Sequence, residues 1–139
     1  MGGIVGSLED FGYLANSLNT GALSGSNKDS AGIAGYCGSK SELVCNLNVG
    51  SNWERPINSN AGLIVEYVDN VYIYGLCNYQ DVMSSSDINP RTLDTISLKS
   101  QYSENWDFDS DKSVWKLTEK RGYFPIPYRS SMEFERVEE

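Results

Sequence analysis

The chain has 139 residues, of which 40% are hydrophobic, and this is enough for one folded domain. Nineteen acidic residues against 11 basic ones give a net charge of −8, which argues against a surface for nucleic acid or anionic lipid. No apolar run approaches the roughly 18 residues that cross a bilayer, so we expect no membrane insertion. Histidine is absent, which excludes mechanisms that use imidazole as a base or as a metal ligand.

Turn-forming residues are abundant beside many valines, isoleucines, leucines and tyrosines, and this favours many short strands with little helix. The three cysteines, Cys37, Cys45 and Cys77, follow neither a disulfide framework nor zinc-ligand spacing. We expect them to be small buried apolar side chains.

The chain contains an internal repeat. The tetrapeptide Gly-Ile-Val-Gly at 3–6 recurs 29 residues later as Gly-Ile-Ala-Gly at 32–35, and Leu-Asn-Thr-Gly at 18–21 recurs with the same offset at 47–50. A weaker third copy follows at an offset of 30, where Ala-Gly-Leu occupies 61–63. We expect units at about 1–30, 31–60 and 61–83, because one common offset for separate motifs indicates stacked repeats.

The repeat predicts an all-β fold, a parallel β-solenoid (β-helix) of about three coils. An asparagine in each copy is expected to form a side-chain amide ladder at a turn: Asn19, Asn48 and Asn78. Three interior stacks are also expected: Ile4, Ile33 and Leu63; Leu14, Leu43 and Ile73; Leu18, Leu47 and Cys77.

The remainder is expected to close the end of the solenoid. Residues 84–94 are poor in apolar side chains and predict a loop, while 95–98 alternate as a strand does. The aromatic-rich segment 95–129 predicts a β-rich C-terminal cap that buries its rings against the last coil. The tail at 130–139 is expected to be an edge strand or disordered.

The two glycine tetrapeptides and the Asn-x-Gly turns at 19–21 and 48–50 resemble the GLUG-repeat family. The aromatic stretches at 105–109, 114–117 and 122–126 are similar to the closing segment that follows such repeats, although Phe124 interrupts the pattern. The resemblance implies a β-helical part of a bacterial surface or secreted, adhesin-like protein. Because the chain begins inside a repeat without a signal peptide, we expect a C-terminal fragment of a longer chain.

One acidic triplet, Asp107, Asp109 and Asp111, has alternating oxygen ligands of the kind that bind calcium. An EF-hand loop starting at Asp107 would need glycine at 112 and glutamate at 118, and both are missing. We expect a polar turn with no cofactor, and calcium is the alternative.

Carboxylate pairs are the groups that a polysaccharide-cleaving β-helix would use. The candidates Glu66, Asp69, Asp81 and Asp87 show no spacing that repeats on one coil face, so solvated surface charge is the preferred interpretation.

Exposed aromatic side chains are the candidate binding groups: Trp53, Tyr67, Tyr72 and Tyr74. Alternation along 71–74 places Tyr72 and Tyr74 outside if Ile73 is inside, where they could stack on a sugar ring or a protein partner. The alternative is that they pack across strands beneath the loop at 52–60.

These patterns predict a non-catalytic module of a cell-surface or secreted bacterial protein that acts in adhesion or as a structural spacer. Its partner would be a glycan or a host or cell-surface protein, and its location extracellular. A polysaccharide-acting enzyme or carbohydrate-binding β-helix segment is one alternative, and a phage or secretion spike is another.

Overall fold

The computed structural model describes residues 2–22, 31–50, 57, 65–73, 88–108 and 114–137. Within these ranges the chain is built mostly from short strands, with two single turns of 3₁₀-helix. The elements are β1 (Tyr13–Ala15), β2 (Leu18–Asn19), β3 (Glu42–Val44), β4 (Leu47–Asn48), β5 (Glu66–Val68), β6 (Asn70–Ile73), β7 (Ile88–Arg91), η1 (Lys99–Gln101), η2 (Glu104–Trp106), β8 (Trp115–Lys116) and β9 (Ile126–Pro127).

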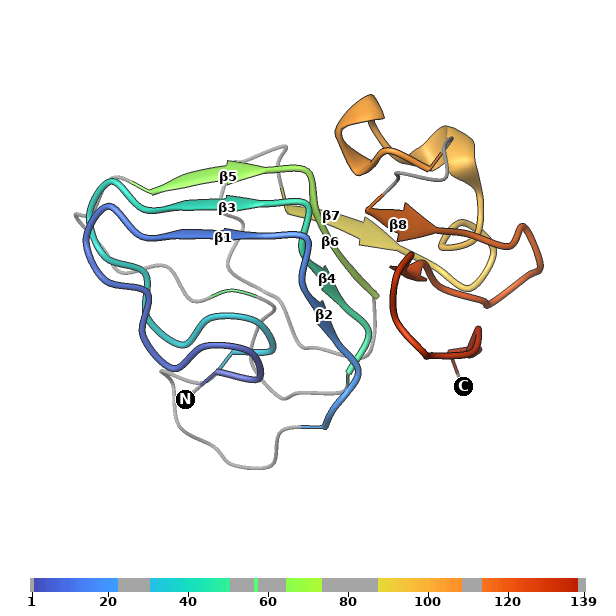
Figure 1. The fold of residues 1–139 in the computed structure, drawn as a ribbon, viewed down its shortest axis with the longest axis horizontal. Helices are drawn as coiled ribbons and strands as arrows, with labels where there is room; N and C mark the ends of the chain where they lie inside the picture. The colour runs from blue at the N-terminus through green and yellow to red at the C-terminus, as the bar shows by residue number, and fades with distance from the viewer. Residues whose placement is uncertain are drawn as a thin grey trace.

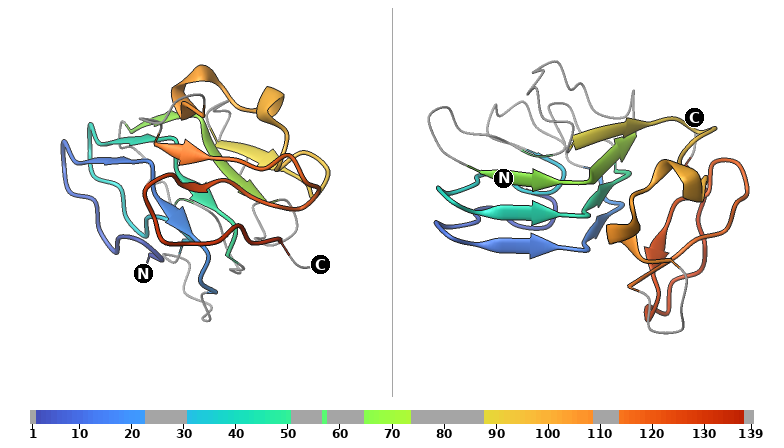
Figure 2. Two further views of the ribbon diagram at one scale, coloured as in Figure 1. Left: turned by 45° about the vertical axis from the view of Figure 1, so that its right-hand side comes forward. Right: turned by 90° about the horizontal axis from the view of Figure 1, so that it is seen from above.

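The successive repeats are stacked, and each contributes one strand to each of two parallel sheets. The first sheet has the order β1-β3-β5 and the second β2-β4-β6-β7, and a row of parallel bridges between 2–8 and 31–37 forms a further side. Figures 1 and 2 show β1, β3 and β5 lying directly over one another. We call 2–22 the first layer, 31–50 the second, and 57 with 65–73 the third. The expected all-β fold with parallel strands is confirmed.

The third layer does not follow the offset of 30 that the sequence suggests. Leu43 pairs with Tyr67 and Leu47 with Val71, so Ile73 and Cys77 are not the third members of these stacks. Ala34 pairs with Ile57, at an offset of 23, and Leu63, which was expected to stack on Ile33, lies outside the described residues. The repeat is therefore 29 residues between the first two layers and 24 along β3 and β5.

The register is fixed by a corner between the two sheets. Asn16, Cys45 and Asp69 occupy equivalent positions there, and their φ angles are 55°, 53° and 53°. We call these three residues the corner column. Asparagine and aspartate tolerate this left-handed conformation better than most residues, so Asp69 provides a favourable third corner. An offset of 30 would instead place Gly75 at the corner and Leu76 after it.

The residues after the corner form a buried amide ladder. Asn46 Oδ1 accepts from the Ser17 backbone N–H at 3.1 Å, and Asn46 Nδ2 donates to the Leu14 carbonyl at 3.0 Å. Asn70 Oδ1 accepts from both the backbone N–H and the Nδ2 of Asn46, at 3.1 and 3.0 Å. Leu76 could not supply these bonds, which explains why the third layer takes the shorter offset.

A second ladder lies on β2 and β4, where Asn19 Nδ2 donates to Asn48 Oδ1 at 2.8 Å. Its third position is Tyr72, because Asn48 pairs with that residue in the register of β4 and β6. The place expected for Asn78 is therefore taken by a tyrosine, and Asn78 itself lies outside the described residues. The aspartate-asparagine pair at 69–70 sets this register, so the ladder does not continue into a third asparagine.

Alternation along the second sheet divides the apolar side chains between two cores. One core lies between the sheets of the stack and includes Ile33, Leu43, Ile57, Tyr67 and Tyr72. The other lies between the second sheet and the C-terminal segment 92–137. It contains Leu47, Val71, Ile73, Ile96, Trp106, Trp115, Phe124, Ile126 and Val137. Leu18, Leu47 and Ile73 thus face the C-terminal segment, whereas the sequence predicted that they point into the solenoid interior.

The C-terminal segment packs along the side of the stack rather than over its end. The right-hand view of Figure 2 shows it beside the stacked strands, and its apolar side chains pack against the second sheet. The Trp115 indole N–H donates to Asn16 Oδ1 at 3.2 Å in the first layer, and the Trp106 indole N–H donates to the Asp69 carbonyl at 3.1 Å in the third. Leu18, Leu47 and Val71 present an apolar stripe on that side, and the C-terminal segment removes this stripe from water.

Several local expectations change in this region. Residues 88–91, expected within a loop, form β7, whose Pro90 stands at the edge of the sheet where no ladder N–H is needed. Residues 95–98, expected to be a strand, lie in turns around hydrogen bonds back to Thr92. The described part of the C-terminal segment is irregular apart from η1, η2, β8 and β9, so it is less β-rich than expected. In the tail, Val137 is buried, and Arg136 forms an isolated antiparallel β-bridge with Tyr123.

Candidate functional site

The outer surface of the first sheet carries the candidate site. Tyr13, Glu42 and Glu66 are aligned in one column across β1, β3 and β5, and we call this column the outer face. All three side chains are exposed, and Tyr13 is 64% exposed. Neighbouring members of a parallel column lie about 4.8 Å apart, so the face presents one ring and two carboxylates at fixed spacing.

Alternation along the strands explains this arrangement. Leu14, Leu43 and Tyr67 follow directly in sequence and point into the core between the sheets, where the side chain of Leu43 is fully buried. Because successive side chains of a strand point to opposite sides, the residues before them must face outward. The buried column therefore holds the outer face in place.

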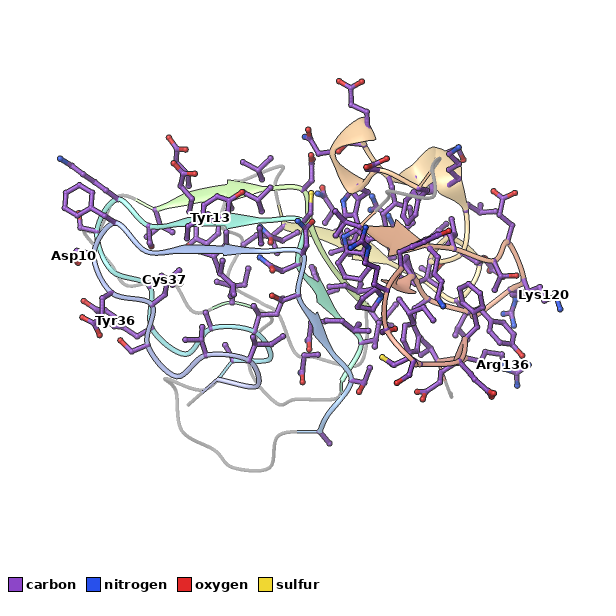
Figure 3. The ribbon with its side chains drawn as sticks, viewed as in Figure 1. Asp10, Tyr13, Tyr36, Cys37, Lys120 and Arg136 are labelled. Carbon is purple, nitrogen blue, oxygen red and sulfur yellow. The ribbon has the colours of Figure 1, made fainter. Side chains whose placement is uncertain are left out.

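The corner before β1 adds a second exposed ring. Phe11 is 73% exposed and has a φ of 62°, and Lys40 in the next layer places its Nζ 5.3 Å from the ring centroid. Asp10 Oδ1 accepts from the Ser39 N–H at 2.8 Å and ties this corner to the second layer. In Figure 3, Asp10 and Tyr13 lie on the stack, far from Lys120 and Arg136 in the C-terminal segment.

An exposed aromatic ring beside carboxylates can bind in two ways. The ring offers an apolar surface for stacking on a sugar or on another ring. The carboxylates accept hydrogen bonds from sugar hydroxyls or from basic side chains. The outer face therefore offers the groups needed to bind a sugar or a basic partner.

The aromatic residues predicted from the sequence do not form this face. Tyr67 and Tyr72 are each only 6% exposed and belong to the core between the sheets, so the expectation that they point outward is wrong. The register at Asp69 and Asn70 turns Tyr72 inward and Ile73 toward the C-terminal segment. Trp53 and Tyr74 lie outside the described residues.

The predicted carboxylates are dispersed. Glu66 belongs to the outer face, whereas Asp69 lies at the corner, where its Oδ2 accepts from Ser103 Oγ at 2.6 Å and Asn105 Nδ2 at 2.8 Å. Asp69 thus has a structural role in holding the C-terminal segment. Asp81 and Asp87 fall outside the described ranges.

The proposed calcium ligands cannot be assembled from the described chain. Asp107 ends η2 with a φ of 48°, while Asp109 and Asp111 are outside the described residues. Among the residues that the structure describes, no group of three acidic or cysteine side chains is placed to hold a metal ion.

Cys37 is buried in the core between the sheets, and Cys45 is buried in the core beneath the C-terminal segment. Burial raises the pKa of the Cys37 and Cys45 thiols from 9.0 to about 12, and Asp69 contributes to the shift at Cys45. A thiol that stays protonated is a poor nucleophile, which fits packing rather than reactivity. Cys77 lies beyond the described residues.

Tyr13 is the residue that sequence reasoning missed. Its signal was present in the alternation of Tyr13, Leu14 and Ala15, since Leu14 was already assigned to an interior stack. An aromatic residue one position before an interior leucine must point outward.

Comparison of the chain with protein-family models, with curated proteins and with solved structures gave no match. No helix in the described ranges is long and apolar enough to cross a membrane.

Proposed function

We propose that the stacked sheets are a parallel β-solenoid of the GLUG-repeat type with the C-terminal segment packed along its side. In this proposal the chain is a non-catalytic module of a bacterial surface or secreted protein, acting in adhesion or as a structural spacer. The observation that carries the proposal is the outer face, on which Tyr13, Glu42 and Glu66 stand in one rigid column.

Rigidity supports a display role. The backbone beneath the outer face is held by bonds such as Glu42 N–H to the Gly12 carbonyl at 2.9 Å, and by the buried amides of Asn46 and Asn70 behind the corner. A binding surface that is already ordered loses little conformational entropy when it meets a partner. A spacer benefits from the same property because its length stays constant.

The experiment measures binding of the purified chain to a glycan array and to intact animal cells. Adhesion through the outer face predicts that Tyr13→Ala abolishes binding and that Glu42→Gln with Glu66→Gln weakens it. Tyr128→Ala is the matched control, since this tyrosine is also exposed but lies in the C-terminal segment. If every variant binds as the parent does, the outer face is not the adhesive surface.

Two further measurements test the alternatives. Cleavage of a polysaccharide that is lost in Glu66→Gln would overturn the non-catalytic assignment. Trimers in light scattering would favour a phage or secretion spike. Absence of binding to every glycan and cell, in a monomer of normal stability, would leave the spacer role as the proposed one.

A further inference from the structure

The first layer has an edge that no described strand covers. β1 and β2 are edge strands of the two sheets. Among the described strands, β1 pairs only with β3 and β2 only with β4, both in the second layer. The C-terminal segment packs on the side of the stack, and none of its described strands pairs with this edge. Ile4 is accordingly 36% exposed, whereas its equivalent in the second layer, Ile33, is fully buried.

The backbone groups on this edge follow from the bonds to β3. The Glu42 N–H donates to the Gly12 carbonyl, and the Asn16 N–H donates to the Val44 carbonyl. In a parallel ladder the groups of alternate residues point to one neighbour and those of the intervening residues to the other side. The N–H and C=O groups of Tyr13 and Ala15 therefore point away from β3, toward the open edge.

This edge is complementary to itself. If two copies meet as antiparallel β1 strands with their two-fold axis at Leu14, Tyr13 of one copy stands opposite Ala15 of the other. Both residues direct their backbone groups outward, so each such pair exchanges two hydrogen bonds. The large ring of Tyr13 then lies beside the smallest side chain of the strand, which removes a steric clash.

The apolar side chains fit the same arrangement. Leu14 is half-buried and, with Val5 and Leu8, packs at the open end of the core between the sheets. A two-fold axis through Leu14 places the interiors of both copies over one another, so these side chains are covered by their own equivalents. We propose that the open β1 edge is a self-association surface, through which two copies of this chain form a symmetric antiparallel dimer.

The pairing is tested first by sedimentation of the full chain over a concentration series. We expect a reversible monomer–dimer equilibrium. Ala15→Pro removes one edge N–H from each copy and leaves the bonds between β1 and β3, so the dimer should become about 30-fold weaker. Tyr36→Ala, an exposed side chain of the second layer, is the control and should not change the equilibrium.

Cross-linking tests the register even if Ala15→Pro fails to fold. In a Cys77→Ser background, Leu14→Cys should give a disulfide-linked dimer, because residues facing each other across the axis lie about 4.5 Å apart. Tyr13→Cys is more exposed but lies off the axis, at more than about 7 Å from its equivalent, so it should not cross-link to itself.

Three results would overturn the proposal: a parent chain that remains monomeric up to about 1 mM, equal cross-linking by Tyr13→Cys and Leu14→Cys, or growth into longer head-to-tail chains. The dimer does not depend on ligand binding by the outer face. Glu66→Gln, two strands away from the edge, should leave it intact, so failure of one proposal is distinguishable from failure of the other.

Discussion

Replacement of Asn70 by alanine tests whether the buried amide ladder stabilises the third layer. The side chain is 1% exposed, and its Oδ1 accepts two hydrogen bonds from Asn46. Its Nδ2 donates to the Leu43 carbonyl at 2.8 Å. Asn70→Ala therefore removes three bonds and leaves the buried Asn46 backbone N–H without this acceptor.

The expected loss can be worked out from these contacts. Each bond contributes about 0.5–1.5 kcal/mol net, and a buried donor left without a partner costs about 1–3 kcal/mol. We expect the free energy of unfolding to fall by about 3–5 kcal/mol, which for a chain of this size lowers the melting temperature by about 10–15 °C. Such a loss is a large part of the roughly 5–15 kcal/mol that stabilises an ordinary domain.

The assay is urea unfolding followed by tryptophan fluorescence, since Trp106 and Trp115 are buried and should report loss of the core. Asn105→Ala is the matched control, because its exposed amide makes one bond, to Asp69, and its loss should cost less than about 1 kcal/mol. If Asn70→Ala is no more destabilising than Asn105→Ala, the amide ladder does not hold the register of the third layer.

The remaining predictions use other parts of the fold. Gly32→Ala should destabilise by about 2–4 kcal/mol in thermal unfolding because a Cβ there would meet a buried ladder amide at 2.4 Å, whereas Gly6→Ala, with nothing within 4 Å, should be neutral or slightly stabilising. Trp115→Phe removes the indole bond to Asn16 and leaves a cavity where the larger ring was buried, so unfolding measurements should show a loss of about 2–4 kcal/mol. The raised pKa of Cys37 and Cys45 means that the folded state favours the neutral thiol, so stability should be complete below pH 9.0 and should decline as the pH rises toward about 12. Replacing both with alanine should reduce that decline in urea titrations, and an unchanged pH dependence would contradict the assignment.

The first two layers could be predicted because their sequences repeat the same chemistry with one offset. Leu14 stacks on Leu43, and Leu18 on Leu47, as the 29-residue spacing requires. The repeated glycine beside the asparagine ladder also has a structural reason, since a side chain at Gly32 would collide with Asn48. In these two layers, residues that match in the sequence repeat also pair with each other in the sheets.

The third layer could not be predicted from similarity of that kind. Its register follows a backbone requirement, a left-handed residue before a buried amide, which Asp69 and Asn70 satisfy at a different spacing. The sequence prediction aligned Leu63 with Ile33 and Ile73 with Leu43 because these residues are all apolar. Similarity of that kind carries no information about the φ angle at the corner. The error in register then placed Tyr72 on the outside, whereas its side chain is buried in the core between the sheets.

The position of the C-terminal segment was also beyond sequence reasoning. Its aromatic residues indicated that it buries apolar surface, but not whether that surface was the end or the side of the stack. The choice depends on Leu18, Leu47 and Val71 pointing outward together, and this is known only once the register is known.

The two tryptophan bonds have a mechanical consequence. One joins the C-terminal segment to the first layer and the other joins it to the third. The segment thus links layers that could otherwise unfold one at a time. Stacked repeats usually fray from a terminus, because each rung touches only its neighbours. Because the C-terminal segment is bonded to both the first and the third layer, opening the first also disturbs the contacts of the third. Amide protons throughout the stack should therefore exchange with solvent in one concerted event.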